Sequence, residues 1–200
     1  MKLIYTFFFL FICYTAFGQK MPDYSVRKIR ITDTDRTILA EIIPINSSPE
    51  PQSGLTYYWY ATNKVHTLQG GYSGQLLNGA YTETYLNHNL RTQGTFKKGL
   101  KDGIWKDWDE RGTLIQVVNW RAGIRSGPFS FFNPDGSLKE SGEYHVNELN
   151  GPIVFHEGPD SVRTIYYSNG KALNGKPKSF FNKLNIFKKK PKTGKDKGHA

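Results

Sequence analysis

The chain has 200 residues, of which 38% are hydrophobic and 22% charged, and a formal net charge of +10 at pH 7. This length allows one domain or two small ones. The single cysteine, Cys13, lies in an N-terminal apolar run, which excludes a disulfide, a cysteine zinc cluster and a cysteine nucleophile from the remainder of the chain.

The positive charge is concentrated at the C-terminus. Residues 171–200 contain ten lysines and a single acid, whereas residues 19–170 contain equal numbers of basic and acidic residues. A nucleic-acid-binding protein is expected to carry a basic face on its folded domain. The distribution therefore argues against binding of DNA or RNA.

Residues 1–18 predict a cleavable secretory signal peptide. The apolar run from Leu3 to Phe17 follows Lys2 and ends in the small-x-small spacing of residues 16–18, which a signal peptidase accepts. The run is shorter than the roughly 20 apolar residues of a membrane helix, and an uncleaved anchor is the alternative. We expect the mature chain to begin at Gln19 and to be exported to the periplasm, the outer-membrane periphery or the extracellular space.

Residues 19–53 predict an N-terminal β-hairpin and a linker. Two runs rich in β-branched residues, 26–32 and 36–43, are separated by the short turn sequence Asp33-Thr34-Asp35, which is typical of a hairpin. Proline and serine residues without apolar periodicity follow in residues 46–54. This composition indicates a linker.

Residues 54–170 contain an internal repeat, because similar residues recur at one fixed interval. The interval is visible in three columns: Tyr72, Phe96, Trp120 and Tyr144; Gly79, Gly103, Gly127 and Gly151; and Tyr81, Trp105, Phe129 and Ile153. A period in the twenties indicates one small supersecondary unit that is copied and that buries its apolar face on its neighbours.

Each repeat predicts a β-hairpin, because two extended runs are joined by glycine-bearing turns. The clearest turn sequences are Glu110-Arg111-Gly112 and residues 133–136, Asn-Pro-Asp-Gly. Residues 57–60 and 69–74 are interpreted as a first, irregular unit, and the unit that begins at Gly151 as a degenerate last one. The predicted turn glycines are Gly79, Gly103, Gly112, Gly127, Gly136 and Gly151.

The aromatic residues of the repeat predict a core. Trp105 and Trp108 are three residues apart, so they lie on opposite faces of a regular strand unless a bulge intervenes. Either arrangement suits a single-layer sheet whose rings cover one another across strands. The predicted core residues are Tyr72, Tyr81, Phe96, Trp105, Trp108, Trp120, Phe129, Phe132 and Tyr144.

The spacing of glycines and aromatic residues in the repeat resembles the bacterial variant of the MORN repeat. The pattern is carried by Gly103, Trp105, Trp108, Gly112, Leu114, Trp120 and Gly123, and again by Gly127, Phe129, Phe132, Gly136, Leu138, Gly142 and Tyr144. The resemblance covers residues 55–170. It implies an all-β fold, an elongated single-layer antiparallel sheet of stacked hairpins, in a family that is mostly scaffolding and partner-binding. Many bacterial relatives are labelled antitoxin-like, which implies a cytoplasmic partner and conflicts with the predicted signal peptide.

No pattern of catalytic or cofactor-binding residues is evident. No Gly-Lys pair is followed by the Ser or Thr of a phosphate loop, and the five histidines lack the paired spacing of metal ligands. The densest acidic group, Asp102, Asp107, Asp109 and Glu110, is interpreted as a solvated rim balanced by neighbouring cations. We therefore predict no enzyme activity, no cofactor, no metal and no small-molecule substrate.

Residues 171–200 form a basic tail with a short apolar stripe. Phe180, Phe181, Leu184 and Phe187 can share one helical face, and basic residues follow at Lys188, Lys189, Lys190 and Lys192. The stripe is compatible with a cap on the last hairpin, a docking site for a partner, or an interfacial helix on an anionic membrane. The predicted function is that of an exported cell-envelope scaffold for protein partners, and the alternative is a membrane-surface protein that binds anionic lipid through the tail.

Overall fold

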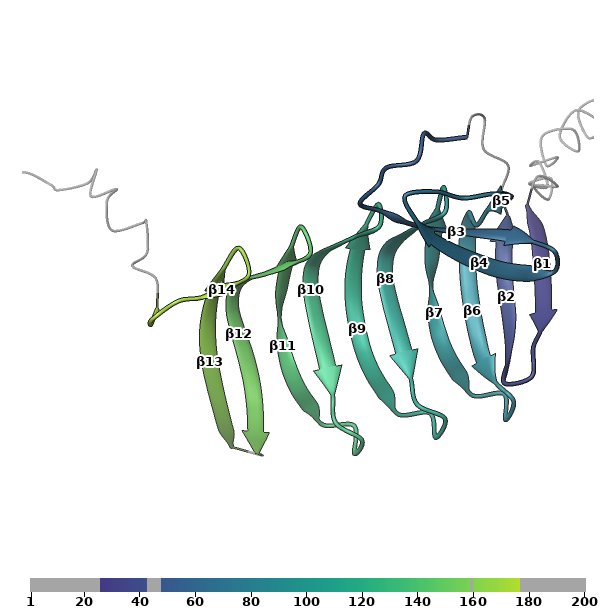
Figure 1. Cartoon of the computed structure of the whole chain (residues 1–200). Helices are drawn as coiled ribbons and strands as arrows, with labels where there is room; N and C mark the ends of the chain where they lie inside the picture. Colours follow the sequence, from purple (N-terminus) through teal and green to yellow (C-terminus); the bar gives the residue numbers. More distant parts are fainter. Residues whose placement is uncertain (1–25, 43–47, 159, 177–200) are drawn as a thin grey trace, which may run out of the picture.

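The computed structural model describes residues 26–42, 48–158 and 160–176, and these form an all-β structure (Figure 1). The strands are β1 (Arg27–Thr32), β2 (Arg36–Ile42), β3 (Thr56–Ala61), β4 (Lys64–Gln69), β5 (Gln75–Leu76), β6 (Gly79–Tyr85), β7 (Leu90–Lys97), β8 (Leu100–Trp108), β9 (Leu114–Arg121), β10 (Ile124–Phe132), β11 (Leu138–His145), β12 (Glu148–Gly158), β13 (Ser161–Ser168) and β14 (Lys171–Ala172).

Eleven of the strands form one long antiparallel sheet in the order β1-β2-β6-β7-β8-β9-β10-β11-β12-β13-β14. From β6 onward each strand pairs with the next one in the sequence, so the sheet is a row of hairpins. This arrangement confirms the predicted all-β class and the long antiparallel sheet of stacked hairpins. Strands β3, β4 and β5 form a second sheet of three strands.

The N-terminal hairpin is confirmed and is an integral part of the long sheet. Strands β1 and β2 pair across the turn at residues 33–35. Strand β2 then pairs with β6, with Ala40 opposite Tyr81 and Ile38 opposite Glu83. The hairpin therefore extends the row of repeats at its N-terminal end.

The small sheet covers one face of the long sheet at this end (Figure 1). Tyr58 and Tyr60 of β3 and Val65 of β4 pack on a core formed by side chains of β1, β2, β6, β7 and β8. The alternate residues Tyr57 and Trp59 point to the other side of the small sheet, where they form a second core cluster. Residues 57–60 and 69–74 are thus not a first repeat unit, because their strands pair with each other and not with the row of hairpins.

The tightest hairpin turns lie at positions that were not predicted as turns. Strands β7 and β8 are joined by the two-residue turn Lys98-Gly99, with φ angles of 51° and 78°, and β9 and β10 by Ala122-Gly123, with 48° and 81°. Positive φ at both residues is typical of the type I′ turn, whose twist matches that of antiparallel strands. Of the predicted turn glycines, Gly112 and Gly136 lie in the turns at the opposite ends of the strands.

The predicted turn glycines Gly103, Gly127 and Gly151 lie inside strands β8, β10 and β12, and Gly79 is the first residue of β6. The pairing skips residues at each of the three interior positions; for example, Thr95 pairs with Asp102 but Gln93 pairs with Lys106. These three glycines have φ angles of 73°, 101° and 80°. They therefore lie in glycine-bearing β-bulges, a kind of bulge that uses a residue of positive φ as a tight type I′ turn does.

A second bulge recurs near the other end of each hairpin. The pairing register shifts between Glu83 and Thr84, between Asp107 and Trp108, and between Phe131 and Phe132. These positions recur at the interval of the sequence repeat. The extra residue lies in the second strand of the hairpin, where Ile115 of β9 falls between the partners of Asp107 and Trp108. Strand β8 therefore keeps its alternation, and of the two alternatives for Trp105 and Trp108, both faces of the sheet carry aromatic residues.

Large side chains lie over glycines of the neighbouring strand, both in the core under the small sheet and in the cluster beyond it. A Cβ atom on Gly94 would lie 2.3 Å from Cδ2 of Trp105, and one on Gly142 would lie 2.3 Å from Cδ1 of Ile153. Trp105 is 2% exposed and Ile153 is 0% exposed. The glycines thus allow the side chain of the next strand to lie flat and cover the backbone.

Hydrogen bonds from each tight turn to a residue near the start of a preceding strand couple each hairpin to the one before it. The N–H of Gly99 donates to the carbonyl of Leu77, that of Gly123 to Lys101, and that of Asn147 to Arg125, at 2.8, 2.8 and 2.9 Å. Repeat units that bond mainly to their neighbours gain most of their stability from the interfaces between units.

Candidate binding site

One face of the long sheet carries half-buried aromatic residues beyond the small sheet. The central residues Val118, Phe129 and Ile153 are buried. Around them lie the partly buried side chains of Trp120, Phe131, Tyr144, Leu149, Phe155 and Tyr167. In Figure 1 the small sheet lies over the end of the long sheet that contains β1, β2 and β6, and β10 to β13 continue past it. We call this part of the face the aromatic face.

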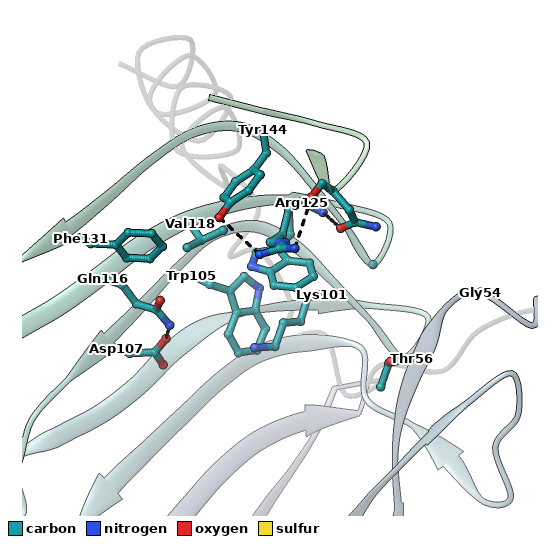
Figure 2. Close-up of a pocket in the computed structure, with 13 residues that line it drawn as sticks. Gly54, Thr56, Lys101, Trp105, Asp107, Gln116, Val118, Arg125, Phe131 and Tyr144 are labelled. Carbon is teal, nitrogen blue, oxygen red and sulfur yellow. Dashed lines mark hydrogen bonds between the residues drawn. The ribbon is translucent and has the colours of Figure 1, made fainter. Parts of the chain in front are cut away.

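A pocket of about 370 Å³ lies where the small sheet meets the aromatic face (Figure 2). Gly54 and Thr56 line it on the side of the small sheet. The other lining residues come from the long sheet and its turns: Lys101, Trp105, Asp107, Gln116, Val118, Trp120, Gly123, Arg125, Phe131, Tyr144 and Asn147. The segment that leads into the small sheet therefore forms one side of the pocket, and the row of hairpins forms the rest.

Two cations alternate with aromatic rings along the pocket. The Nζ atom of Lys101 lies 4.1 Å from the ring centroid of Trp105 and 5.3 Å from that of Trp120. The guanidinium carbon of Arg125 lies 4.5 Å from the ring centroid of Tyr144. Lys101 and Arg125 occupy the same position in successive units, so the repeat places both cations in one row of the sheet.

Neither cation of this pair has a carboxylate partner in the part of the chain that the structure describes. Within residues 26–42, 48–158 and 160–176, no carboxylate oxygen lies within 4.0 Å of the Lys101 ammonium or the Arg125 guanidinium. The one acid of the pocket, Asp107, accepts hydrogen bonds from Oγ1 of Thr92 at 2.7 Å and Nε2 of Gln116 at 2.5 Å. Burial lowers the pKa of Lys101, although the negative charge of Asp107 opposes this shift. The pocket thus holds an excess of positive charge.

The indole nitrogen of Trp105 is a further polar group of the pocket. Trp105 is 2% exposed, and its Nε1 is buried without a hydrogen-bond acceptor in the described part of the chain. In native proteins most buried donors are satisfied, and each exception calls for an explanation.

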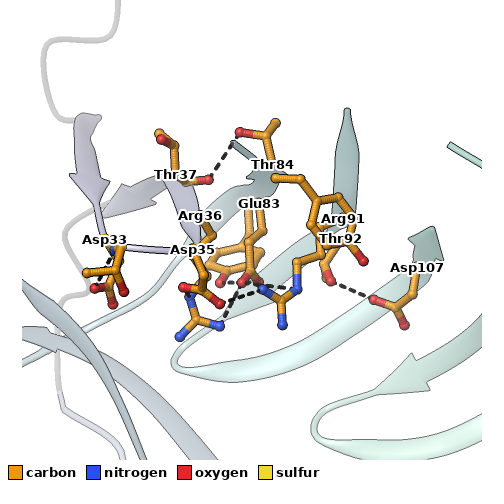
Figure 3. Close-up of polar contacts among 12 residues, drawn as sticks. Asp33, Asp35, Arg36, Thr37, Glu83, Thr84, Arg91, Thr92 and Asp107 are labelled. Atoms are coloured by element: carbon orange, nitrogen blue, oxygen red, sulfur yellow. Dashed lines mark hydrogen bonds and ion pairs between the residues drawn. The ribbon is translucent and has the colours of Figure 1, made fainter. Parts of the chain in front are cut away.

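A second polar cluster joins the N-terminal hairpin to the first repeats (Figure 3). Glu83 is buried and accepts hydrogen bonds from Nη1 of Arg36 at 2.9 Å and from the hydroxyl of Tyr81 at 3.1 Å. Nη1 of Arg91 donates to Oδ2 of Asp35 at 3.1 Å. Burial, followed by the charge of Glu83, raises the pKa of Tyr81 far above its usual range. Nε of Arg36 is buried without an acceptor in the described part of the chain, but the other charged groups pair with one another across β2, β6 and β7, and we assign the cluster a structural role.

The predicted core residues fall into three groups. Tyr81, Phe96, Trp105 and Phe129 are buried, whereas Trp108, Trp120, Phe132 and Tyr144 are half-buried. Tyr72 lies outside the long sheet: its ring packs on Tyr57 with centroids 5.4 Å apart, and its hydroxyl donates to the carbonyl of Pro49. The match of Tyr72 to the repeat period therefore does not place it in the row of hairpins.

The acidic group of residues 102–110 is divided between different places. Oδ1 of Asp102 accepts a hydrogen bond from the N–H of Ala122, and Oδ1 of Asp109 accepts one from the N–H of Thr113. These carboxylates cap turns at opposite ends of the strands. Asp107 alone reaches the pocket.

Lys101, Arg125 and Glu83 were not predicted from the sequence as site residues. A signal for them exists in the repeat, because Lys101 and Arg125 share one column and Glu83 and Asp107 share another. A polar residue in a column that faces the core is unusual and marks a position worth testing.

Several predicted features lie outside the described residues: the signal peptide, the new N-terminus at Gln19, and the tail residues from Phe180 to Lys192. In the ranges that are described, no group of three or more His, Cys, Asp or Glu side chains could hold a metal ion. The same ranges contain no helix long and apolar enough to cross a membrane.

Comparisons with known proteins found no matching family model, no matching curated protein and no matching solved structure.

Proposed function

We propose that this protein is a non-catalytic, exported scaffold that binds a protein partner on the aromatic face. The observation that carries the proposal is the row of half-buried rings across β9 to β13, next to a pocket that holds two cations without carboxylate partners among the described residues. Aromatic residues and arginine are the side chains that contribute most to protein interfaces.

A binding role is also supported by the hydrogen bonds that the carboxylates accept from other groups of the fold. Glu83 is engaged by arginine and tyrosine, Asp107 by threonine and glutamine, and Asp109 by a backbone turn. A general acid or base needs access to a substrate proton, and these carboxylates are occupied by donors of the fold. Export rests on residues 1–18, and scaffolding accords with the resemblance of the repeat to the MORN pattern.

Partner capture from native envelope extracts, followed by mass spectrometry, tests this proposal with a matched pair of variants. Tyr166 and Tyr167 are neighbours in β13, and alternation along a strand directs them to opposite faces; Tyr167 packs on the aromatic face. We expect Tyr167→Ala to lose the captured partner and Tyr166→Ala to retain it, with unfolding midpoints measured for both. Equal capture by the two variants, at equal stability, would refute the proposal.

A further inference from the structure

We propose that the pocket between the small sheet and the aromatic face binds a carboxylate group of an acidic side chain on the partner protein. Lys101 and Arg125 supply the positive charge, and the rings of Trp105, Trp120 and Tyr144 supply the walls. This inference rests on the proposed function, because it names the chemistry of the partner at that surface.

Contacts within the protein orient the guanidinium of Arg125 in a way that suits a planar anion. It lies over the ring of Tyr144, Nη1 donates to the Tyr144 hydroxyl at 3.3 Å, and Nη2 donates to the carbonyl of Asn147 at 3.3 Å. These contacts use two of the five N–H donors of the group. The remaining donors are fixed in position, and a planar fork that is already ordered suits a carboxylate.

The ammonium of Lys101 is only partly compensated. Its cation–π contacts with Trp105 and Trp120 offset part of the free-energy cost of taking a cation out of water, and the lowered pKa shows that burial outweighs the attraction of Asp107. Among the described residues, Arg36, Arg91 and Arg163 have carboxylate partners at 2.9, 3.1 and 2.6 Å. An anion in the pocket would give Lys101 the partner that these arginines already have.

The buried N–H of Trp105 supports the inference independently, because it has no acceptor among the described residues. An unsatisfied buried donor destabilises a fold, because it has lost its hydrogen bond to water without a replacement. This donor belongs to a 2% exposed residue that lines the pocket, and the Lys101 ammonium covers the same ring. The pocket thus combines two cations with a buried indole N–H that has no acceptor among the described residues (Figure 2).

The surroundings favour an acidic side chain of a protein. Trp120 and Phe131 give the pocket apolar walls, and the aromatic face continues from them across β11 to β13. Apolar residues on either side of the acid would bury their side chains on these rings, whereas an isolated inorganic anion would use none of them. A charged residue flanked by apolar ones is therefore the best match in shape and charge.

Titration of the exported chain with four probes tests the inference, and the indole ¹⁵N–¹H resonance of Trp105 reports on the pocket. The probes are acetyl-Leu-Glu-Leu-amide, its Gln counterpart, glucuronate and inorganic phosphate. We expect the Glu peptide to shift this resonance and to bind more tightly than the other three. Equal binding of the Glu and Gln peptides would overturn the inference, as would tighter binding of phosphate or glucuronate.

Three variants complete the test. Arg125→Gln and Lys101→Met should each weaken binding of the Glu peptide at least about tenfold, the effect of losing one charge-assisted hydrogen bond. Lys106→Met is the matched control, because Lys106 is exposed and alternation places it on the opposite face from Trp105; it should bind as the unmodified chain does. Unchanged binding by Arg125→Gln would contradict the assignment even if Lys101→Met failed to fold.

The same variants separate this inference from the proposed function. If Arg125→Gln still captures the partner that Tyr167→Ala loses, the aromatic face binds a protein but the carboxylate pocket is wrong. If neither variant changes capture, the proposed function fails as well.

Discussion

Replacement of Gly94 by alanine should destabilise the protein through Trp105. The added Cβ would lie 2.3 Å from Cδ2, 2.4 Å from Cε2 and 2.8 Å from Cγ of that ring. These atoms are the rigid centre of an indole and not the end of a flexible chain. The ring must therefore move by about 1 Å to reach ordinary van der Waals contact, and close packing around it resists that movement.

The size of the effect follows from how tightly the ring is held. Trp105 packs on Phe96 and Tyr81 with ring centroids 4.8 and 5.8 Å apart, and the Lys101 ammonium lies over it. Overpacking of this kind costs about 1 to 3 kcal/mol. Alanine recovers roughly 0.5 to 1 kcal/mol, because it loses less backbone entropy than glycine. The difference is about 0 to 2.5 kcal/mol. Because the clash involves the rigid centre of a tightly packed ring, we expect a net loss in the upper part of this range, about 1 to 2.5 kcal/mol, in the free energy of unfolding.

Urea unfolding of a double-mutant cycle measures the coupling. Trp105→Leu removes the ring, so Gly94→Ala should be neutral or stabilising in that background, and the two changes should couple by at least about 0.5 kcal/mol. Gly54→Ala is the matched control, because a Cβ at Gly54 meets nothing within 4 Å. Additive effects in the cycle, or a Gly94→Ala variant as stable as the original chain, would refute the view that rings over glycines form the core.

Four further predictions concern the core, the acid response, export and the tail. Phe129→Ala should lower the free energy of unfolding by about 3 to 5 kcal/mol, since Phe129 is 2% exposed; an unchanged urea midpoint would show that the ring is not core. A hydrogen bond from the backbone N–H of Thr113, with a smaller contribution from Arg111, lowers the pKa of Asp109 below its ordinary 3.8. The stabilisation is therefore present above about pH 4 and lost as the pH falls through the lowered pKa, and Asp109→Asn should flatten the acid limb of a stability profile. Mass spectrometry of protein recovered outside the cytoplasm should find Gln19 at or near the N-terminus, and intact Met1 on cytoplasmic protein would contradict export. In vesicle co-sedimentation, the mature chain should bind anionic vesicles more strongly than a chain ending at Gly175, and the difference should shrink with salt; equal binding would exclude a membrane role for the tail.

The row of hairpins was predictable because its information is local. Each pair of strands from β6 to β13 is connected by a short turn, so the apolar residues, the glycines and the turn sequences that specify a hairpin lie within one repeat unit and recur in the next. If the sequence of one unit is misinterpreted, the other units still show the pattern. The all-β class and the stacking of hairpins were therefore predictable.

The role of each glycine was harder to predict. Gly99 in a type I′ turn and Gly103 in a β-bulge both have positive φ, and a repeat column shows only that this freedom is needed. Which of the two is the turn depends on the pairing register, and the register is a property of two strands together.

Only the tertiary structure decided how the N-terminal part is used. Strand β2 pairs with β6, with Ala40 opposite Tyr81, although the linker and the small sheet separate these strands in the sequence. The small sheet packs on strands that precede it in the sequence and on strands that follow it. Contacts over such separations leave no periodic trace in a single sequence. One side of the pocket depends on them, because Thr56 of the small sheet lines it together with Arg125 and Tyr144 of the repeats. The sequence by itself thus determined the repeating sheet, through local hydrophobic patterning, whereas long-range packing placed a non-repeating segment beside the cations and rings of the repeats and so formed one side of the pocket.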